Sequence, residues 1–166
     1  MAWCRRHPDG LLLHLVSNEV DLLRFLTREL RRLLENGDFS QPAMHGFSPA
    51  QQRKHDPEAA AGELDEAMDE ELLVYRLERV EQVSRDFMEP EQSAEDGLTL
   101  QLDMPKADTW LAWLTDLRLL LGAVLGMSPD NPDPIDFKDP GEWSLEERMY
   151  VFLSELQEMM LAKMGI

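Results

Sequence analysis

The segment 110–126, WLAWLTDLRLLLGAVLG, is the feature that most constrains the fold, because it is the most apolar stretch of the chain. When successive residues are placed about 100° apart around a helix axis, its large apolar side chains share one broad arc, and Leu119 falls on the opposite face. A helix that is apolar nearly all the way round is usually the one on which other helices pack. The sequence therefore predicts a central helix here.

Two charged residues interrupt this helix. Arg118 falls inside the apolar arc, whereas Asp116 falls outside it. Because burying an unpaired guanidinium costs several kcal/mol, Arg118 must pair with an acid, extend to the surface or lie in an interface. Tryptophan and arginine are also over-represented among binding hot spots. The predicted interaction residues are Trp110, Trp113, Asp116 and Arg118. A structural ion pair at Arg118 is the alternative.

The first part of the chain predicts a β-hairpin followed by a helix. Ala2–Arg6 and Leu11–Val16 flank a His-Pro-Asp-Gly turn. Ser17 is the expected N-cap of a helix that ends near Asn36. Its expected buried stripe is Val20, Leu23, Leu26, Leu30, Leu33 and Leu34.

The same helix carries a cluster of four arginines. Its members are Arg24, Arg28, Arg31 and Arg32. One interpretation is a solvated helix face with favourable cations near its C-terminal end. The other is a docking patch, either for an acidic partner or for the acidic helix that follows in this chain.

A second helix is predicted over residues 58–89, between Asp56-Pro57 and Pro90. Its expected apolar side is Leu64, Met68, Leu72, Leu73, Tyr75, Leu77, Val80, Val83 and Phe87. Its outer face is acidic over residues 63–71, and residues 57–103 contain 3 basic and 15 acidic side chains. Like charges at this density repel one another, so either solvent screens them or a basic partner binds them.

One further strand and one further helix complete the prediction. Residues 97–103 alternate Leu98, Leu100 and Leu102 with polar residues, which is typical of a half-buried strand that pairs with the hairpin. Asp103 then caps the central helix. A capping box at Ser144 starts the last helix, which carries Met149, Met159, Met160 and Met164. These methionines either fill core gaps or form a surface that binds partners.

Together these elements predict one mainly helical α+β domain over residues 1–166. It contains about four helices and a small antiparallel sheet, formed by the hairpin and a strand near residues 98–103.

The sequence lacks the common motifs of catalytic, metal-binding and cofactor-binding sites, so we expect neither a metal nor a cofactor. It contains no nucleophile elbow, zinc-protease motif, phosphate loop or dinucleotide-binding loop. Cys4 is the single cysteine, so an intramolecular disulfide is excluded. Aspartates recur every three residues over 130–139, but prolines occupy the turn that a calcium loop needs. We expect that the protein is not an enzyme. The alternative is an enzyme or a small-ligand-binding protein whose site is not visible in the sequence.

The net charge of −17 disfavours direct binding of nucleic acid. The N-terminal residues lack the pattern of a signal peptide, and no apolar run is long enough to span a membrane. We therefore expect a cytoplasmic location.

The residues of the central motif are Trp110-Leu111, Asp116-Leu117-Arg118-Leu119, Leu121-Gly122 and Leu125-Gly126. This motif resembles the signature of an actinobacterial family of unknown function. In that family a similar hairpin and leucine-rich helix come first, a strand precedes the signature, and a helix ends the chain. Members are often encoded beside the adaptor of the Clp protease. Some look like regulators of the oxidative-stress response that act through a cysteine pair and contact with a sigma factor.

This chain departs from that pattern because Cys4 has no second cysteine, which leaves oxidation or intermolecular pairing of Cys4. We expect a non-enzymatic interaction protein with a regulatory role. The resemblance implies a sigma factor or protease adaptor as its protein partner. A homodimer through the methionine-bearing last helix is a further alternative.

Overall fold

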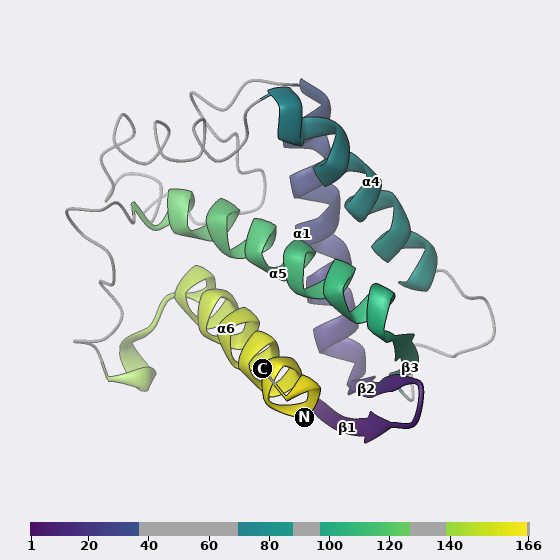
Figure 1. Ribbon diagram of the computed structural model, residues 1–166. Helices are drawn as coiled ribbons and strands as arrows, with labels where there is room; N and C mark the ends of the chain where they lie inside the picture. The colour runs from purple at the N-terminus through teal and green to yellow at the C-terminus, as the bar shows by residue number, and fades with distance from the viewer. Residues whose placement is uncertain (37–69, 88–96, 127–138, 166) are drawn as a thin grey trace.

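The computed structural model of the protein describes residues 1–36, 70–87, 97–126 and 139–165. The elements in these ranges are β1 (Trp3–His7), β2 (Gly10–Leu15), α1 (Ser17–Asn36), α4 (Glu70–Phe87), β3 (Leu98–Asp103), α5 (Met104–Val124), the short 3-10 helix η1 (Pro140–Glu142) and α6 (Leu145–Met164) (Figure 1). The predicted mainly helical α+β class is confirmed. That residues 1–166 form a single domain stays a prediction.

The three strands form one antiparallel sheet in the order β1-β2-β3. In the middle strand, Leu13 pairs with Cys4 on one side and with Leu100 on the other. The predicted hairpin and its pairing with the later strand are therefore confirmed. Side chains alternate between the faces of a strand, and the face that carries Leu11, Leu13 and Leu15 is buried.

Gly97 occupies a position that a larger residue cannot adopt without strain. Its φ is +83°, and a Cβ atom there would lie 2.4 Å from the backbone oxygen of Leu15. We expect Gly97→Ala to lower the free energy of unfolding by about 1–3 kcal/mol from the backbone conformation alone. Gly141→Ala is the matched control, because nothing lies within 4 Å of its Cβ position. Equal urea midpoints for the two variants would contradict this prediction.

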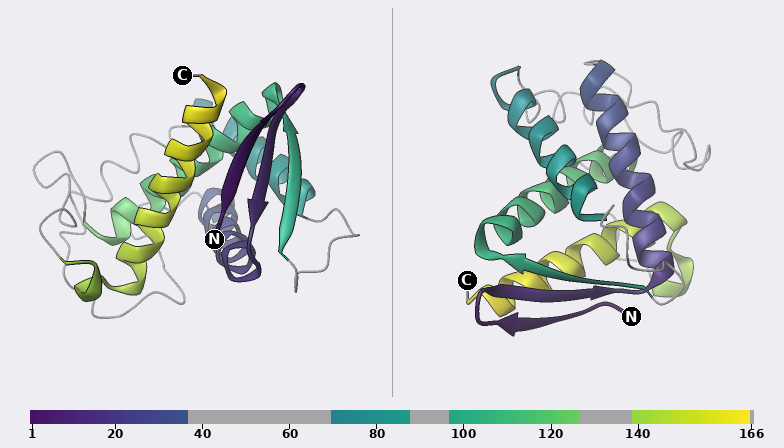
Figure 2. Two further views of the ribbon diagram at one scale, coloured as in Figure 1. Left: turned by 90° about the horizontal axis from the view of Figure 1, so that it is seen from below. Right: turned by 90° about the vertical axis from the view of Figure 1, so that its right-hand side faces the viewer.

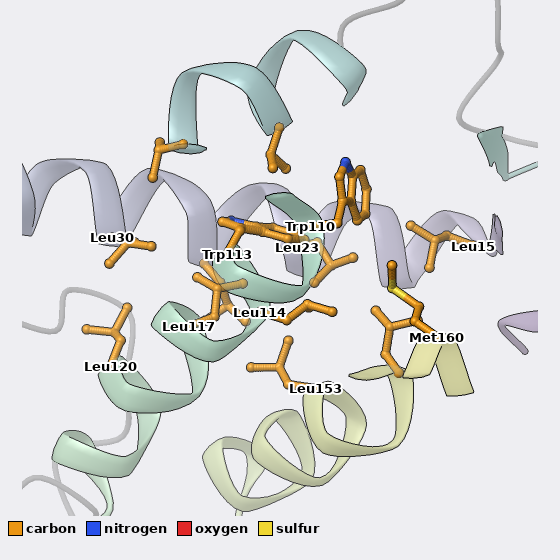
Figure 3. Packing of buried hydrophobic residues seen from close by; sticks show 14 of the residues in the cluster. Leu15, Leu23, Leu30, Trp110, Trp113, Leu114, Leu117, Leu120, Leu153 and Met160 are labelled. Carbon is orange, nitrogen blue, oxygen red and sulfur yellow. The ribbon is translucent and has the colours of Figure 1, made fainter. Parts of the chain in front are cut away.

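All four long helices lie on one side of the sheet (Figure 2). Helix α5 contacts α1, α4, α6, β2 and β3, so it is the central helix that the sequence predicted. Trp110 and Trp113 are fully buried within it, and their rings meet edge to face with centroids 4.9 Å apart. Around them pack leucines of α1 and α5, together with Leu153 and Met160 of α6 (Figure 3).

The start of α1 differs from the prediction by one residue. Ser17 is the first helical residue rather than the N-cap, because the Val20 N–H donates to the oxygen of Val16 at 3.0 Å. Glu19 explains the difference, since its carboxylate accepts a hydrogen bond from the Val16 N–H at 2.9 Å. All six residues of the predicted stripe of α1 are buried.

The predicted caps of α5 and α6 are confirmed. The Asp103 carboxylate accepts from the Lys106 N–H at 2.9 Å, and Ser144 and Glu147 form the capping box of α6. Of the methionines in α6, Met149 and Met160 are buried in the core, so the core-filling interpretation is confirmed for these two.

Helix α4 corresponds to the second half of the predicted helix over 58–89. Val80 and Val83 are buried as predicted, but Tyr75 is 63% exposed, so its place on the apolar side was wrong. The physical reason is that Arg76 points into the core in its place, and consecutive helical residues lie about 100° apart. The predictions for residues 37–69 and for the loop aspartates before Asp139 lie outside the described residues.

Candidate functional site

Asp116 is the most deeply buried acid of α5 and was expected outside the apolar arc. Asp116 is only 1% exposed, whereas Arg118, which was expected inside the arc, is partly exposed. The expected burial of these two residues is thus reversed. The cause is that α5 is surrounded by other elements, and the side of Asp116 faces α4 rather than solvent.

Two arginines of α4 reach Asp116. Arg76 donates to Oδ1 of Asp116 in a buried ion pair, and a guanidinium nitrogen of Arg79 lies 3.2 Å from Oδ2. Burial raises the pKa of the Asp116 carboxyl above its ordinary value, and the charges of Arg76 and Arg79 act in the opposite direction. The three residues form a buried ion cluster that joins α4 to α5.

A second polar contact joins the same two helices near the start of α5. The indole Nε1–H of Trp110 donates to Oδ2 of Asp86 at 2.8 Å. The other oxygen of Asp86 accepts from Gln82 at 3.4 Å and lies 3.9 Å from Nζ of Lys106. Trp110 is therefore both a core residue and the donor that compensates a buried carboxylate of α4.

Arg118 joins α5 to α6 through neutral partners. Its guanidinium donates to Oε1 of Gln157 at 2.8 Å and to the hydroxyl of Tyr150 at 3.2 Å, and it lies over the Tyr150 ring. Among the described residues, no acid forms an ion pair with Arg118. The sequence suggested an acidic partner for Arg118, but in the described part of the chain its hydrogen-bond partners are the amide of Gln157 and the phenol of Tyr150.

The arginine cluster of α1 also acts within the chain. A nitrogen of Arg31 lies 3.0 Å from a carboxylate oxygen of Glu81 and donates to the hydroxyl of Ser84 at 2.8 Å. Arg32 pairs with Glu29 on its own helix at 3.2 Å. For Arg31, the proposal that the cluster holds the chain's own acidic helix is confirmed.

A surface groove of about 560 Å³ runs between α4 and α5, directly above the buried ion cluster. Its lining is Tyr75, Glu78, Arg79, Gln82, Arg85, Asp108, Thr109 and Ala112. Arg79 belongs to both features, since its side chain is 27% exposed and its guanidinium pairs with Asp116. The buried carboxylate thereby fixes a cation in the wall of the groove.

The four predicted interaction residues lie in the core or at its margin rather than on an open surface. Trp110, Trp113 and Asp116 are buried, and Arg118 lies between α5 and α6. Their role in binding stays a prediction, and in this arrangement it is indirect, through the positions of α4 and α6. Sequence reasoning missed Arg76 and Arg79. Their spacing of three residues on a largely apolar helix side was the available signal.

The described residues contain no group of three histidine, cysteine or acidic side chains that could hold a metal ion. Cys4 is buried, and burial raises the pKa of its thiol, although Lys163 acts in the opposite direction. A raised pKa lowers the fraction of reactive thiolate. In the described ranges, no helix combines the length and apolarity that crossing a bilayer requires.

These features define a class: a mainly helical α+β protein in which one sheet face is covered by helices and a buried ion cluster fixes a surface groove. More specifically, the chain belongs to the family described as Domain of unknown function (DUF2017), whose model matches residues 1–164. The expectation of a family of unknown function is thereby confirmed. No curated protein and no solved structure matches the chain.

Proposed function

We propose that the protein is a non-enzymatic interaction protein that binds another protein through the surface of α4 and the groove beside it. The observation that carries the proposal is a pair of consecutive exposed apolar residues, Val74 and Tyr75. Their exposed fractions are 58% and 63%. Tyr75 lines the groove, and Val74 directly precedes it.

The chemistry of this surface supports protein binding. Binding hot spots are enriched in tyrosine and arginine and are surrounded by polar contacts that exclude water. Here Tyr75 and the fixed cation Arg79 lie in one groove, with Glu78 and Asp108 on its two walls. A groove between two helices suits an amphipathic helix of a partner, whose apolar side chains would cover Tyr75.

The partner is, in this proposal, a regulatory protein. The family resemblance of the central motif implies a sigma factor or a Clp-protease adaptor, so these are the first two proteins to test. The excess of acidic residues over 57–103 would attract a basic stretch of either one.

Binding should be lost when the exposed apolar pair of α4 is made polar. We expect the double variant Val74→Ser, Tyr75→Ser to bind its partner at least about tenfold more weakly, because the apolar anchors of the contact are removed. The matched control is Leu145→Ser, which removes a 61% exposed apolar residue at the start of α6. Affinity is measured with each purified partner, and thermal unfolding verifies that all variants are folded.

Two outcomes would contradict the proposal. Equal loss in the control would show a general effect of exposed apolar surface, and unchanged affinity in the α4 variant would place the contact elsewhere. Light scattering at two concentrations separates partner binding from self-association. If binding does not weaken with added salt, the acidic residues over 57–103 do not attract a basic stretch of the partner.

A further inference from the structure

The outer edge of β3 is a second candidate binding surface. Strand β3 forms one edge of the sheet and, among the described residues, pairs only with β2 (Figure 2). Folded proteins usually protect an edge strand with a lysine, a proline or a bulge, because its free backbone groups can pair with a further strand. Residues 98–102, LTLQL, contain neither lysine nor proline, and their pairing with β2 is continuous. This edge therefore lacks the usual protection.

The contacts of two glycines show which backbone groups point to this edge. A Cβ atom at Gly97 would collide with the backbone oxygen of Leu15. A Cβ atom at Gly10 would collide with the backbone oxygen of Leu102. Both carbonyl groups therefore point between β2 and β3. Since backbone direction alternates along an antiparallel pair, the N–H and C=O groups of Gln101 point away from β2. Gln101 is exposed, and among the described residues no backbone hydrogen bond outside the sheet uses these two groups.

A pocket of about 390 Å³ lies along this edge. Its lining is Leu12, Leu98, Thr99, Leu100, Gln101 and Leu102 of the sheet, Asp86 of α4 and Lys106 of α5. Pockets that bind ligands commonly have volumes of about 300–1,000 Å³. The pocket thus combines a strand edge with one acidic and one basic side chain.

The two charged side chains of the pocket contact each other only loosely. Oδ1 of Asp86 lies 3.9 Å from Nζ of Lys106 and 3.4 Å from the amide nitrogen of Gln82. Trp110 donates only to the other oxygen, Oδ2. Because the Asp86 side chain is 8% exposed, Oδ1 is a buried acceptor that lacks a close donor. The charges of the pair balance, so a neutral amide that donates to Asp86 and accepts from Lys106 suits the pocket better than a charged group.

We propose that the edge of β3 binds an extended segment of a partner protein, which adds to the sheet as an antiparallel strand. The backbone of the segment pairs with the N–H and C=O groups of Gln101. A glutamine or asparagine of the segment, flanked at alternate positions by apolar residues, reaches Asp86 and Lys106. Main-chain hydrogen bonds supply the affinity and the pocket supplies the specificity. This surface is separate from the groove between α4 and α5, so the proposal does not rest on the proposed function.

A single strand suits this edge better than the sheet of a second copy. Asp86 and Lys106 belong to helices that stand beside the edge. In a symmetric dimer, each copy would bring its own α4 and α5 to the same place. Paired strands lie only about 4.7–4.9 Å apart, which leaves little space for both sets of helices.

The test uses a fluorescein-labelled peptide in which threonine alternates with valine, with one glutamine at a central valine position. We expect saturable binding in fluorescence anisotropy. Gln101→Pro should weaken binding at least about tenfold, because proline has no N–H group to pair with the added strand. Gln101→Ala is the matched control, since it keeps the N–H group and should bind normally. Proline is tolerated at edge positions whose N–H faces solvent, and thermal unfolding verifies that both variants are folded.

Changes in the peptide test the same contact without altering the protein. In an antiparallel addition, the N–H groups of the threonines face β3 and those of the valines face away. N-methylation of the threonines should therefore abolish binding, whereas N-methylation of the valines should not. Replacing the glutamine with glutamate or lysine should weaken binding, because each charge meets a like charge at Asp86 or Lys106.

The proposal is overturned if both methylated peptides bind, if only the valine-methylated peptide fails to bind, or if the glutamate peptide binds as tightly as the glutamine peptide. Equal loss in Gln101→Ala and Gln101→Pro would also overturn it, and the methylated peptides decide if the proline variant does not fold. A concentration-dependent dimer broken by Gln101→Pro would assign the edge to a second copy instead. The serine variant at Val74 and Tyr75 should bind the peptide normally. Failure of this proposal is thereby distinguishable from failure of the groove on α4.

Discussion

Replacing Arg76 with methionine should lower the free energy of unfolding by about 3–5 kcal/mol at neutral pH, because breaking a buried ion pair leaves an uncompensated charge. Arg76 is the better buried of the two cations at Asp116, and methionine retains much of its apolar stem. After the change, the carboxylate keeps only Arg79. Urea denaturation followed by circular dichroism measures the effect.

The size of this effect should depend on pH. Burial already raises the pKa of Asp116 above 3.8, and removing a neighbouring cation raises it further. A carboxyl with a raised folded-state pKa contributes stability below its unfolded pKa, and that contribution is lost as pH rises through the folded value. The cost of Arg76→Met should therefore grow as the pH rises above 3.8, the ordinary pKa of an aspartate carboxyl. A cost that is constant with pH would contradict the assignment to Asp116.

A double variant provides the control for the ion cluster. Arg76→Met combined with Asp116→Leu removes both charges, and Arg79 can turn towards water because its side chain is already 27% exposed. Replacing buried ion pairs with packed apolar residues is often neutral or stabilising. The double variant should thus be more stable than Arg76→Met alone. If it is not, the two residues do not act as a coupled pair.

Most secondary-structure elements were predictable because their signals are local. The alternation of Leu98, Leu100 and Leu102 fixes which face of β3 is buried, and the capping box at Ser144 fixes the start of α6. These patterns depend on residues a few positions apart, so they are readable without knowledge of the tertiary fold. The one-residue error at Ser17 also has a local origin, because the Glu19 carboxylate accepts from the Val16 N–H and Val16 becomes the N-cap in place of Ser17.

The candidate site was less predictable because it depends on contacts between distant segments. Asp116 and Arg76 are 40 positions apart, and no local pattern on α5 shows that α4 will cover the side of Asp116. A helical wheel places Asp116 and Arg118 relative to the apolar arc of their own helix, and it contains no information about the neighbouring helix. The exposure of Tyr75 follows from the same contact. Arg76 faces α5, and Tyr75, which lies about 100° away around the helix axis, therefore faces solvent.

The second large effect is expected at Trp110, where packing and hydrogen bonding can be separated. Trp110→Ala should cost about 3–5 kcal/mol of stability, because it removes a fully buried aromatic side chain. Trp110→Phe retains most of the apolar area but removes the donor to Asp86. Since that acceptor is a buried carboxylate, the second change should cost about 1.5–3 kcal/mol. Chemical denaturation of both variants measures the two contributions.

A double-mutant cycle with Asp86→Ala, which removes the acceptor, tests the hydrogen-bond part of this argument. If the bond from Nε1 of Trp110 to Asp86 stabilises the fold, the two substitutions together should cost less than the sum of their separate costs. Trp143→Phe is the matched control, because the Trp143 indole nitrogen has no hydrogen-bond partner in the described part of the chain. An additive cycle, or an equal loss in the control, would mean that ring volume alone accounts for the role of Trp110. The tryptophan would then be a packing residue of α5, and the contact between α4 and α5 would depend on the ion cluster at Asp116.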